Sequence, residues 1–200
     1  MPANPRASLL LIVAFTALLY VSEAVDAALG GALDDEGIIP RQVDGLDGVL
    51  WAPFLHAGWA HLLANTLPVL VLGFLAMAGG IRQFVVVTAT IWIVAGLGTW
   101  LTGGENTVHI GASSLIFGWL TFLLVRGFFA RSFGQILLAV VLFMVYGGAL
   151  LGVLPGQPGI SWQGHLFGAI GGLLAARLVA SADRSRSRPT GPSQPPRLAA

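Results

Sequence analysis

Six mostly apolar stretches limit what this 200-residue chain can fold into. They cover residues 8–29, 59–78, 84–101, 113–125, 133–153 and 164–180. The hydrocarbon core of a bilayer is about 30 Å thick, and about 20 apolar residues span it as a helix. Only 10% of the residues are charged, whereas soluble domains carry about 25%. We therefore predict an all-α polytopic membrane protein, built as a bundle of six transmembrane helices.

The first stretch has an alternative reading as a secretory signal peptide. It is longer than the apolar part of such a peptide, and no clear small-residue cleavage site follows a short apolar run. We expect it to remain as the first membrane helix.

The distribution of arginine indicates the orientation, since every basic residue of the chain is an arginine. All but Arg41 lie before the first stretch, between the second and third, between the fourth and fifth, or at and after the end of the sixth. The positive-inside rule then places both termini in the cytoplasm. We expect residues 1–181 to form the six-helix domain. Residues 182–200, rich in Arg, Pro and Ser, are expected to form a disordered cytoplasmic tail whose arginines can touch anionic lipid.

Three polar residues on separate predicted helices fall at one depth: Ser113, His165 and Asn65. The inner ends of their helices are marked by Arg126, Arg177 and Gly79, respectively. At 1.5 Å per residue, the three polar residues lie about 20, 18 and 21 Å from these markers. All three are therefore about 10 Å below the outer surface. Strongly polar residues at such a depth are costly, and they are functional candidates by default.

A serine and a histidine at the same depth can form a nucleophile–base pair. Ser113 would attack a carbonyl carbon, while His165 takes the serine proton and later returns one to the leaving amine. The nearest acids, Glu23 and Asp26, are not deep enough to complete a triad, so we expect a dyad. The chain has no cysteine, which excludes disulfides and thiolate nucleophiles. We expect no metal and no cofactor. Because hydrolysis needs water, the site should be a cavity open to the outer side.

Three short motifs occur in order along the chain. They are HLLAN with His61 and Asn65, GASS from Gly111 to Ser114, and GHLFGAIGG with His165, Gly168 and Gly172. In this the chain resembles the rhomboid family of intramembrane serine proteases. That family carries a His-x-x-x-Asn motif on its second core helix, a Gly-x-Ser-Gly motif opening its fourth, and a histidine followed by small residues on its sixth. The resemblance covers the second to the sixth apolar stretch.

The resemblance implies a role for each matching residue. Ser113 and His165 would be catalytic. The transition state would be stabilised by His61, Asn65 and the segment at Gly111, together with the Ser113 backbone N–H. Such donors typically contribute about 3–4 kcal/mol. Supporting roles would fall to three further residues, His56, Phe117 and Gly168.

Two departures from the family pattern bear on the site. Ser114 replaces the usual glycine after the nucleophile, which leaves open which serine reacts, although the Gly-x-Ser register favours Ser113. Phe117 replaces a tyrosine found in many relatives. Because Phe117 is four residues from Ser113, it lies on the same helical face, and we expect it to stack on the His165 ring.

Each candidate also has a structural interpretation. Ser113 can be a small residue for close packing, and His165, His61 and Asn65 can be polar contacts between helices. His56 is as consistent with support of a loop as with catalysis, and we expect His109 to be a solvated loop residue. Three glycines spaced every four residues should let two helices pack closely; they are Gly164, Gly168 and Gly172, expected to face Gly111 and Gly118. The pair Gly147 and Gly148 would permit the fifth helix to move.

Three functions follow from these observations. The first is an intramembrane serine endopeptidase, the second a non-catalytic rhomboid-like protein that binds membrane proteins, and the third a small transporter or channel. Against the third, we see no inverted repeat, and the polar residues gather at one level. By resemblance, the substrates would be single-span membrane proteins cut near the outer face after a small residue. We expect a multi-pass protein of a bacterial plasma membrane, with membrane lipids but no nucleic acid as partners.

Overall fold

The computed structural model describes residue 2 and residues 4–186, and the regular structure of this part of the chain is helical. Six segments are long and apolar enough to cross a membrane. They are α1 (Pro5–Ala28), α3 (Trp59–Ala76) with η4 (Met77–Gly79), α4 (Ile81–Thr102), α5 (Ser113–Ala130), α6 (Phe133–Tyr146) with η5 (Gly147–Val153), and α7 (Trp162–Arg186). The predicted all-α, six-helix polytopic fold is confirmed.

The helices α5 and α7 run further than predicted, whereas the span of α6 and η5, Phe133–Val153, has the predicted bounds. The helix α5 runs on to Ala130, because Arg126 is a good helix former and its guanidinium lies over the Phe122 ring. The helix α6 ends at Tyr146 and continues as the 3₁₀ helix η5 from Gly147; two successive glycines weaken an α-helix at this point. The helix α7 continues to Arg186, so residues 182–186 are helical and do not belong to a disordered tail. The rest of the predicted tail, residues 187–200, lies outside the described residues.

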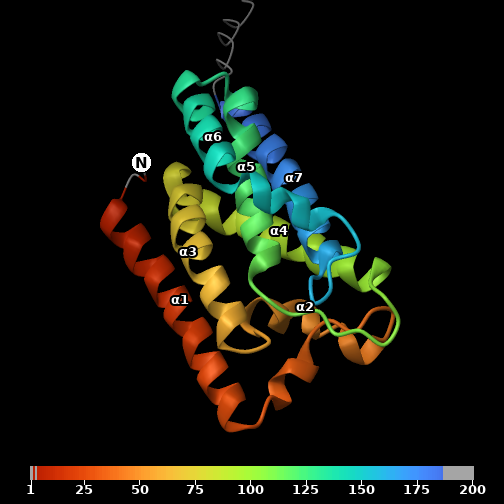
Figure 1. The fold of residues 1–200 in the computed structure, drawn as a ribbon. Coiled ribbons are helices and arrows are strands. Elements are labelled where there is room, and N and C mark those ends of the chain that lie inside the picture. Colours follow the sequence, from red (N-terminus) through yellow and green to blue (C-terminus); the bar gives the residue numbers. More distant parts are fainter. Residues whose placement is uncertain (1, 3, 187–200) are drawn as a thin grey trace, which may run out of the picture.

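The helix α5 occupies the middle of the bundle and packs against α3, α4, α6 and α7 (Figure 1). Its contact with α7 is the closest, because glycines let the two backbones meet. A Cβ added at Gly168 would overlap the carbonyl of Ser114, and one at Gly172 would overlap the carbonyl of Gly118. The predicted small-residue face is therefore present, with one correction. Gly111 lies in the loop before α5 and faces a histidine ring of α3 instead.

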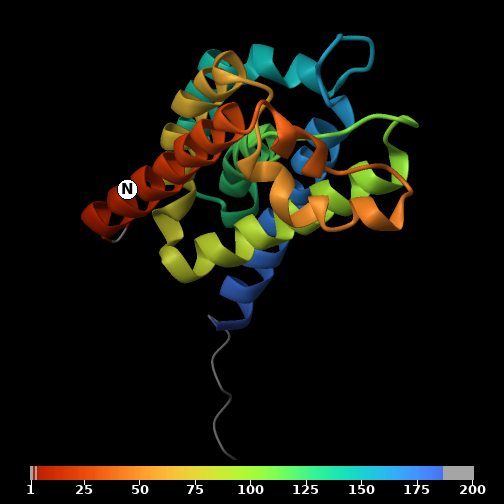
Figure 2. The same ribbon diagram turned by 90° about the horizontal axis from the view of Figure 1, so that it is seen from below.

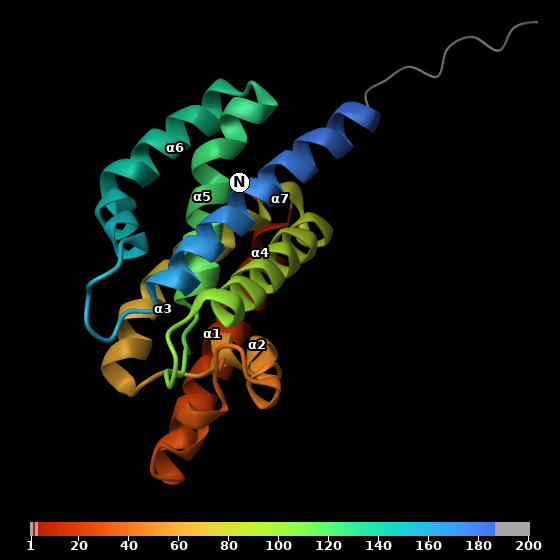
Figure 3. The ribbon, with the colours of Figure 1, turned by 90° about the vertical axis from the view of Figure 1, so that its right-hand side faces the viewer.

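The connections 29–58, 103–112 and 154–161 gather at one end of the bundle, which we call the loop end (Figures 1 and 3). The first of them contains four short helices: η1 (Ala32–Glu36), η2 (Val43–Gly45), α2 (Gly48–Trp51) and η3 (Ala52–Phe54). Side chains of α4 hold this connection, since the indole N–H of Trp92 donates to the Val49 carbonyl at 2.6 Å and that of Trp100 donates to the Gln42 carbonyl at 2.8 Å. The loop end is where α5 and α7 begin.

Two spans lie at the edge of the bundle. The helix α1 runs along the outside and packs mainly on α3 (Figure 2). The span of α6 and η5 is the least buried of the six, and Figure 3 shows it at the side of α5. The tightly packed centre of the protein is therefore formed by α4, α5 and α7, and the site described next lies among their ends.

Candidate active site

Ser113 and His165 are hydrogen-bonded to each other at the loop end. Ser113 is the first residue of α5, and His165 lies in the first turn of α7. Ser113 Oγ and His165 Nε2 are 2.8 Å apart, a distance at which a base can accept the proton of a nucleophile. The close packing of Gly168 on α5 brings the two helices near enough for this contact.

Ser114, the alternative nucleophile, has a different environment. The carbonyl of Ser114 packs against Gly168. Its half-buried side chain lines the cavity described below. The hydroxyl that contacts His165 is the one in the Gly-x-Ser register, that of Ser113.

The other ring nitrogen of His165 determines which tautomer is present. Its Nδ1 lies 3.0 Å from the carbonyl oxygen of Gly152 in η5. A carbonyl oxygen can only accept, so Nδ1 carries the hydrogen and donates it. In a neutral imidazole Nε2 is then bare and accepts the hydrogen bond of the Ser113 hydroxyl. Among the described hydrogen bonds of His165 none involves a carboxylate, and Asp26 accepts instead from the backbone N–H of Leu33.

Phe117 stacks on the His165 ring as predicted. The ring centroids are 4.0 Å apart and the planes differ by 10°. Phe117 is buried and lies one turn after Ser113 on α5. The imidazole is therefore held by contacts on three sides, at Nε2, at Nδ1 and on one face.

His61 and Gly111 meet close to Ser113. His61 Nδ1 accepts a hydrogen bond of 3.2 Å from the backbone N–H of Ala57, so in the neutral ring the hydrogen is on Nε2. Gly111 has φ of +119°, a conformation that disfavours other residues. A Cβ at Gly111 would lie 2.9 Å from His61 Nε2 and 3.6 Å from Ser113 Oγ. The Nε2–H of His61 therefore lies near Ser113, on the other side of the space next to Gly111.

Asn65 is buried one turn after His61, where its Nδ2 donates to the His61 carbonyl at 2.9 Å. An amide nitrogen carries two hydrogens, so a second donor remains. Among the described hydrogen bonds, none joins Asn65 to Ser113.

His56 is almost completely buried, and its Nε2 accepts from the backbone N–H of Ala112 at 3.4 Å. Burial is the main cause that lowers its pKa to about 4, and the nearby His61 lowers it further, while the Phe54 backbone acts in the opposite direction. The neutral ring packs edge-on against His61 with centroids 5.1 Å apart. These contacts favour support of the loop over a direct part in chemistry.

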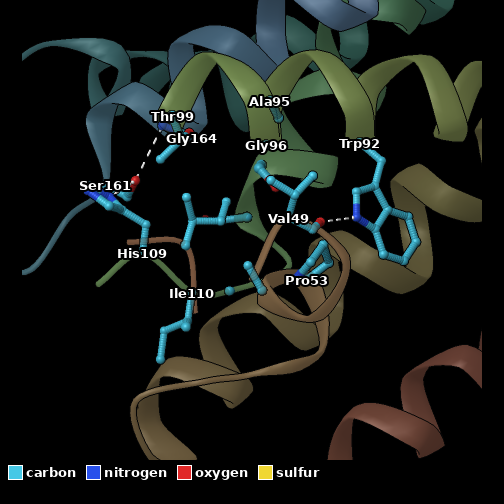
Figure 4. Close-up of a pocket in the computed structure, with 15 residues that line it drawn as sticks. Val49, Pro53, Trp92, Ala95, Gly96, Thr99, His109, Ile110, Ser161 and Gly164 are labelled. Carbon is cyan, nitrogen blue, oxygen red and sulfur yellow. Dashed lines mark hydrogen bonds between the residues drawn. The ribbon is translucent and has the colours of Figure 1, made fainter. Parts of the chain in front are cut away.

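His109 corrects one expectation, because it is not a solvated loop residue. The residue is 9% exposed. Its Nδ1 is 2.6 Å from Ser161 Oγ, and its Nε2 is 2.8 Å from Thr107 Oγ1. Burial lowers the pKa of His109, which favours the neutral form of the ring. Figure 4 shows His109 beside Ser161 at one end of a cavity.

This cavity has a volume of about 20 Å³ and lies where α4 and the loop 103–112 meet the beginnings of α5 and α7 (Figure 4). Its polar lining includes Thr99, His109, Ser113, Ser114 and Ser161. Such a volume holds about one water molecule. The hydroxyl of Thr99 is buried without a hydrogen-bond partner among the described residues, so the site has room and a polar group for a water beside Ser113.

Comparison with known proteins gives the family. A family model for the Rhomboid domain matches residues 46–182, more than half of the chain. The chain belongs to the rhomboid family.

Several curated relatives resemble this rhomboid. An uncharacterized protein of Mycobacterium tuberculosis is 54% identical over 181 residues, which is 86% of this chain and 75% of that protein. An uncharacterized protein of Mycobacterium leprae is 50% identical over 181 residues, 86% of this chain and 72% of the relative. Rhomboid-like protease 5 of Toxoplasma gondii is 34% identical over 153 residues, 72% of this chain but 17% of that longer protein.

Sequence reasoning did not identify two groups of the site. Gly152 acts through its backbone carbonyl, which has no signature in a sequence. Ser161 precedes α7 and could have been noticed as a helix-capping residue, because serine is favoured there, but its contact with a histidine 52 residues away could not.

Proposed function

We propose that this rhomboid is an intramembrane serine endopeptidase that cleaves membrane proteins with a Ser113–His165 dyad. The observation that carries the proposal is the 2.8 Å contact between Ser113 Oγ and His165 Nε2, on an imidazole whose Nδ1 is hydrogen-bonded to the Gly152 carbonyl. This arrangement leaves the basic nitrogen pointing at the nucleophile, which is the geometric requirement for general-base activation.

In the first step, Ser113 Oγ forms a bond to the carbon of the scissile peptide carbonyl as His165 Nε2 takes the hydroxyl proton. The carbonyl π bond becomes an oxyanion. The imidazolium then gives its proton to the amide nitrogen, the oxyanion re-forms the C=O bond as the C–N bond breaks, and the amine product leaves an ester on Ser113.

In the second step, a water attacks the ester carbon while His165 takes one of its protons. The second tetrahedral intermediate collapses, the C–O bond to Ser113 breaks, and the serine recovers its proton from the imidazolium. The cavity beside Ser113 has room for about one water.

Three donors are suited to the oxyanion. The helix α5 provides no acceptor for the N–H of Ser113, because the first N–H groups of a helix have no intrahelical partner. The Nε2–H of His61 lies close to the space between Gly111 and Ser113. The free hydrogen of the Asn65 amide is one turn further along the same helix. Each such donor is worth about 3–4 kcal/mol in the transition state when it is in place.

The substrate and the orientation are further parts of this proposal. We infer substrates with a single membrane span, cleaved near the outer face of a bacterial plasma membrane. The arginine distribution supports cytoplasmic termini, and with that orientation the loop end, including Ser113, faces the outer side.

The test combines chemical labelling with cleavage. Purified protein should react with a fluorophosphonate probe and should cut at least one member of a panel of single-span substrates in detergent or liposomes. Ser113→Ala should abolish both, whereas Ser114→Ala, the matched neighbour, should keep both. If the folded wild-type protein neither reacts with the probe nor cleaves a substrate, the protease hypothesis is wrong, and a non-catalytic rhomboid that binds membrane proteins becomes the better hypothesis.

A further inference from the structure

A second histidine–serine pair joins the same two parts of the chain as Ser113 and His165. His109 lies four residues before Ser113, and Ser161 lies four residues before His165. In both pairs the partners are 52 residues apart. The serine comes first along the chain in the Ser113–His165 pair, and the histidine comes first in the His109–Ser161 pair. The contact between His109 Nδ1 and Ser161 Oγ is 2.6 Å long. The His109–Ser161 pair therefore connects the loop 103–112 with the residue before α7, and the Ser113–His165 pair connects α5 with the first turn of α7.

The hydrogen-bond partners fix the direction of the second pair. The hydroxyl of Thr107 has one hydrogen and donates it to the Gly104 carbonyl at 2.7 Å. Towards His109 it therefore accepts, and His109 Nε2 is the donor at 2.8 Å. The neutral ring then has a bare Nδ1, which accepts the hydrogen of the Ser161 hydroxyl. Ser161 Oγ in turn accepts from the backbone N–H of Gly164 at 3.3 Å.

This chain of hydrogen bonds ends in the helical turn that carries His165. Ser161 caps the first turn of α7 through Gly164, and its own carbonyl accepts from the backbone N–H of His165 at 3.1 Å. The other end is fixed as well, because the backbone of His109 forms a two-way bridge with Ile38, with both hydrogen bonds 3.0 Å long. A shift of Ser161 would therefore move His165, and His109 is the buried side chain that holds Ser161.

We propose that His109 and Ser161 are positioning residues, which hold the first turn of α7 so that the His165 imidazole stays within hydrogen-bond distance of Ser113. This inference rests on the proposed protease function. Both residues line the cavity beside Ser113, but their described hydrogen bonds involve neither Ser113 nor the His165 side chain. Their contribution is to the geometry of the dyad, and a misplacement of about 1 Å in such a geometry lowers the rate by about 100-fold.

Variants at position 109 provide a sharp test. His109→Ala and Ser161→Ala should each lower kcat by about 10- to 100-fold with little change in KM. The double variant should be no slower than the slower single one, since the residues act as one unit. His109→Asn should recover much of the loss, because the asparagine amide reaches the position of Nδ1. His109→Gln, whose amide reaches the position of Nε2, should not. Val108→Thr, an isosteric change at an exposed neighbour, is the matched control.

A second measurement does not depend on proteolysis. NMR of isotope-labelled histidine should show the His165 ring with hydrogen on Nδ1, and His109→Ala should shift these resonances while His109→Asn restores them. Unchanged His165 resonances in His109→Ala, equal losses in the Asn and Gln variants, or losses that follow the melting temperature would each overturn the proposal. If His109→Ala shifts the His165 resonances but the wild-type protein cleaves no substrate, the positioning role stands and the proposed protease function is wrong.

Discussion

Gly152 offers a direct test of how tightly the His165 ring is held. The change Gly152→Ala keeps the backbone carbonyl that accepts from His165 Nδ1, so the tautomer should be preserved. The added Cβ, however, would lie 3.0 Å from His165 Nδ1 and 3.1 Å from Cζ of Phe117. Both rings are stacked on each other and have little room to retreat.

The size of the effect follows from these distances. Ordinary contact of a Cβ begins near 3.4 Å, so the His165 ring must move by roughly 0.4 Å. A misplacement of about 1 Å costs about 100-fold in rate. In proportion, 0.4 Å costs about 6-fold in kcat, or about 1 kcal/mol of transition-state free energy. KM should change little, because the added methyl group lies behind the imidazole and away from Ser113.

The assay is steady-state cleavage of a single-span substrate in detergent, with melting temperature measured on the same samples. Gly134→Ala is the matched control, since it lies in the same membrane span and its added Cβ would have no neighbour within 4 Å. A full kcat in Gly152→Ala, or an equal loss in Gly134→Ala, would refute the claim that contact behind the ring positions the base.

Three further predictions concern the dyad, the orientation and a buried ring. His165→Ala should be as inactive as Ser113→Ala, and the double variant no worse, because the two groups act as a unit; cleavage rates in long incubations measure this, and a clearly slower double variant would contradict it. In right-side-out vesicles a membrane-impermeant thiol reagent should modify Ser113→Cys and spare Arg82→Cys, in a chain that has no cysteine of its own; the reverse pattern would invert the orientation. The folded pKa of His56 is about 4, below the usual 6.5. Between these two values only the unfolded state takes up the proton, so stability should fall as pH drops through this window, by up to about 3 kcal/mol. His56→Gln should flatten this decline in melting temperature, and an unchanged decline would assign it to another group.

Much of the site could be predicted because its residues repeat at helical spacing. Ser113 and Phe117 share one face of α5, so a stacked ring beside the serine was expected from their separation, and the structure shows it on His165. The glycines at 168 and 172 indicated close backbone packing for the same reason. Helical periodicity and membrane thickness are local constraints, and a sequence expresses them directly.

The remaining features depend on contacts between distant parts of the chain. His109 was expected in solvent because it lies in a polar, glycine-rich loop, yet the bridge to Ile38 and the contact with Ser161 bury it. The end of α7 was placed too early because Asp183 and Arg184 look like the start of a polar tail. Both residues are also compatible with the last turns of a helix that extends beyond the apolar core, as α7 does. Composition alone does not distinguish a polar helix end from a disordered tail.

The neutral partner of His165 has a consequence for the turnover rate of the proposed protease. A backbone carbonyl has no charge, so keeping it beside the base inside a membrane protein avoids the desolvation cost of a buried carboxylate. When His165 becomes an imidazolium, however, it faces a dipole and not an anion. Hydrogen bonds to an ionised partner are about twice as strong as those to a neutral one. The neutral dyad therefore has a low desolvation cost, but the imidazolium form of His165 is only weakly stabilised. We expect slow turnover relative to soluble proteases in which an aspartate accepts a hydrogen bond from the histidine.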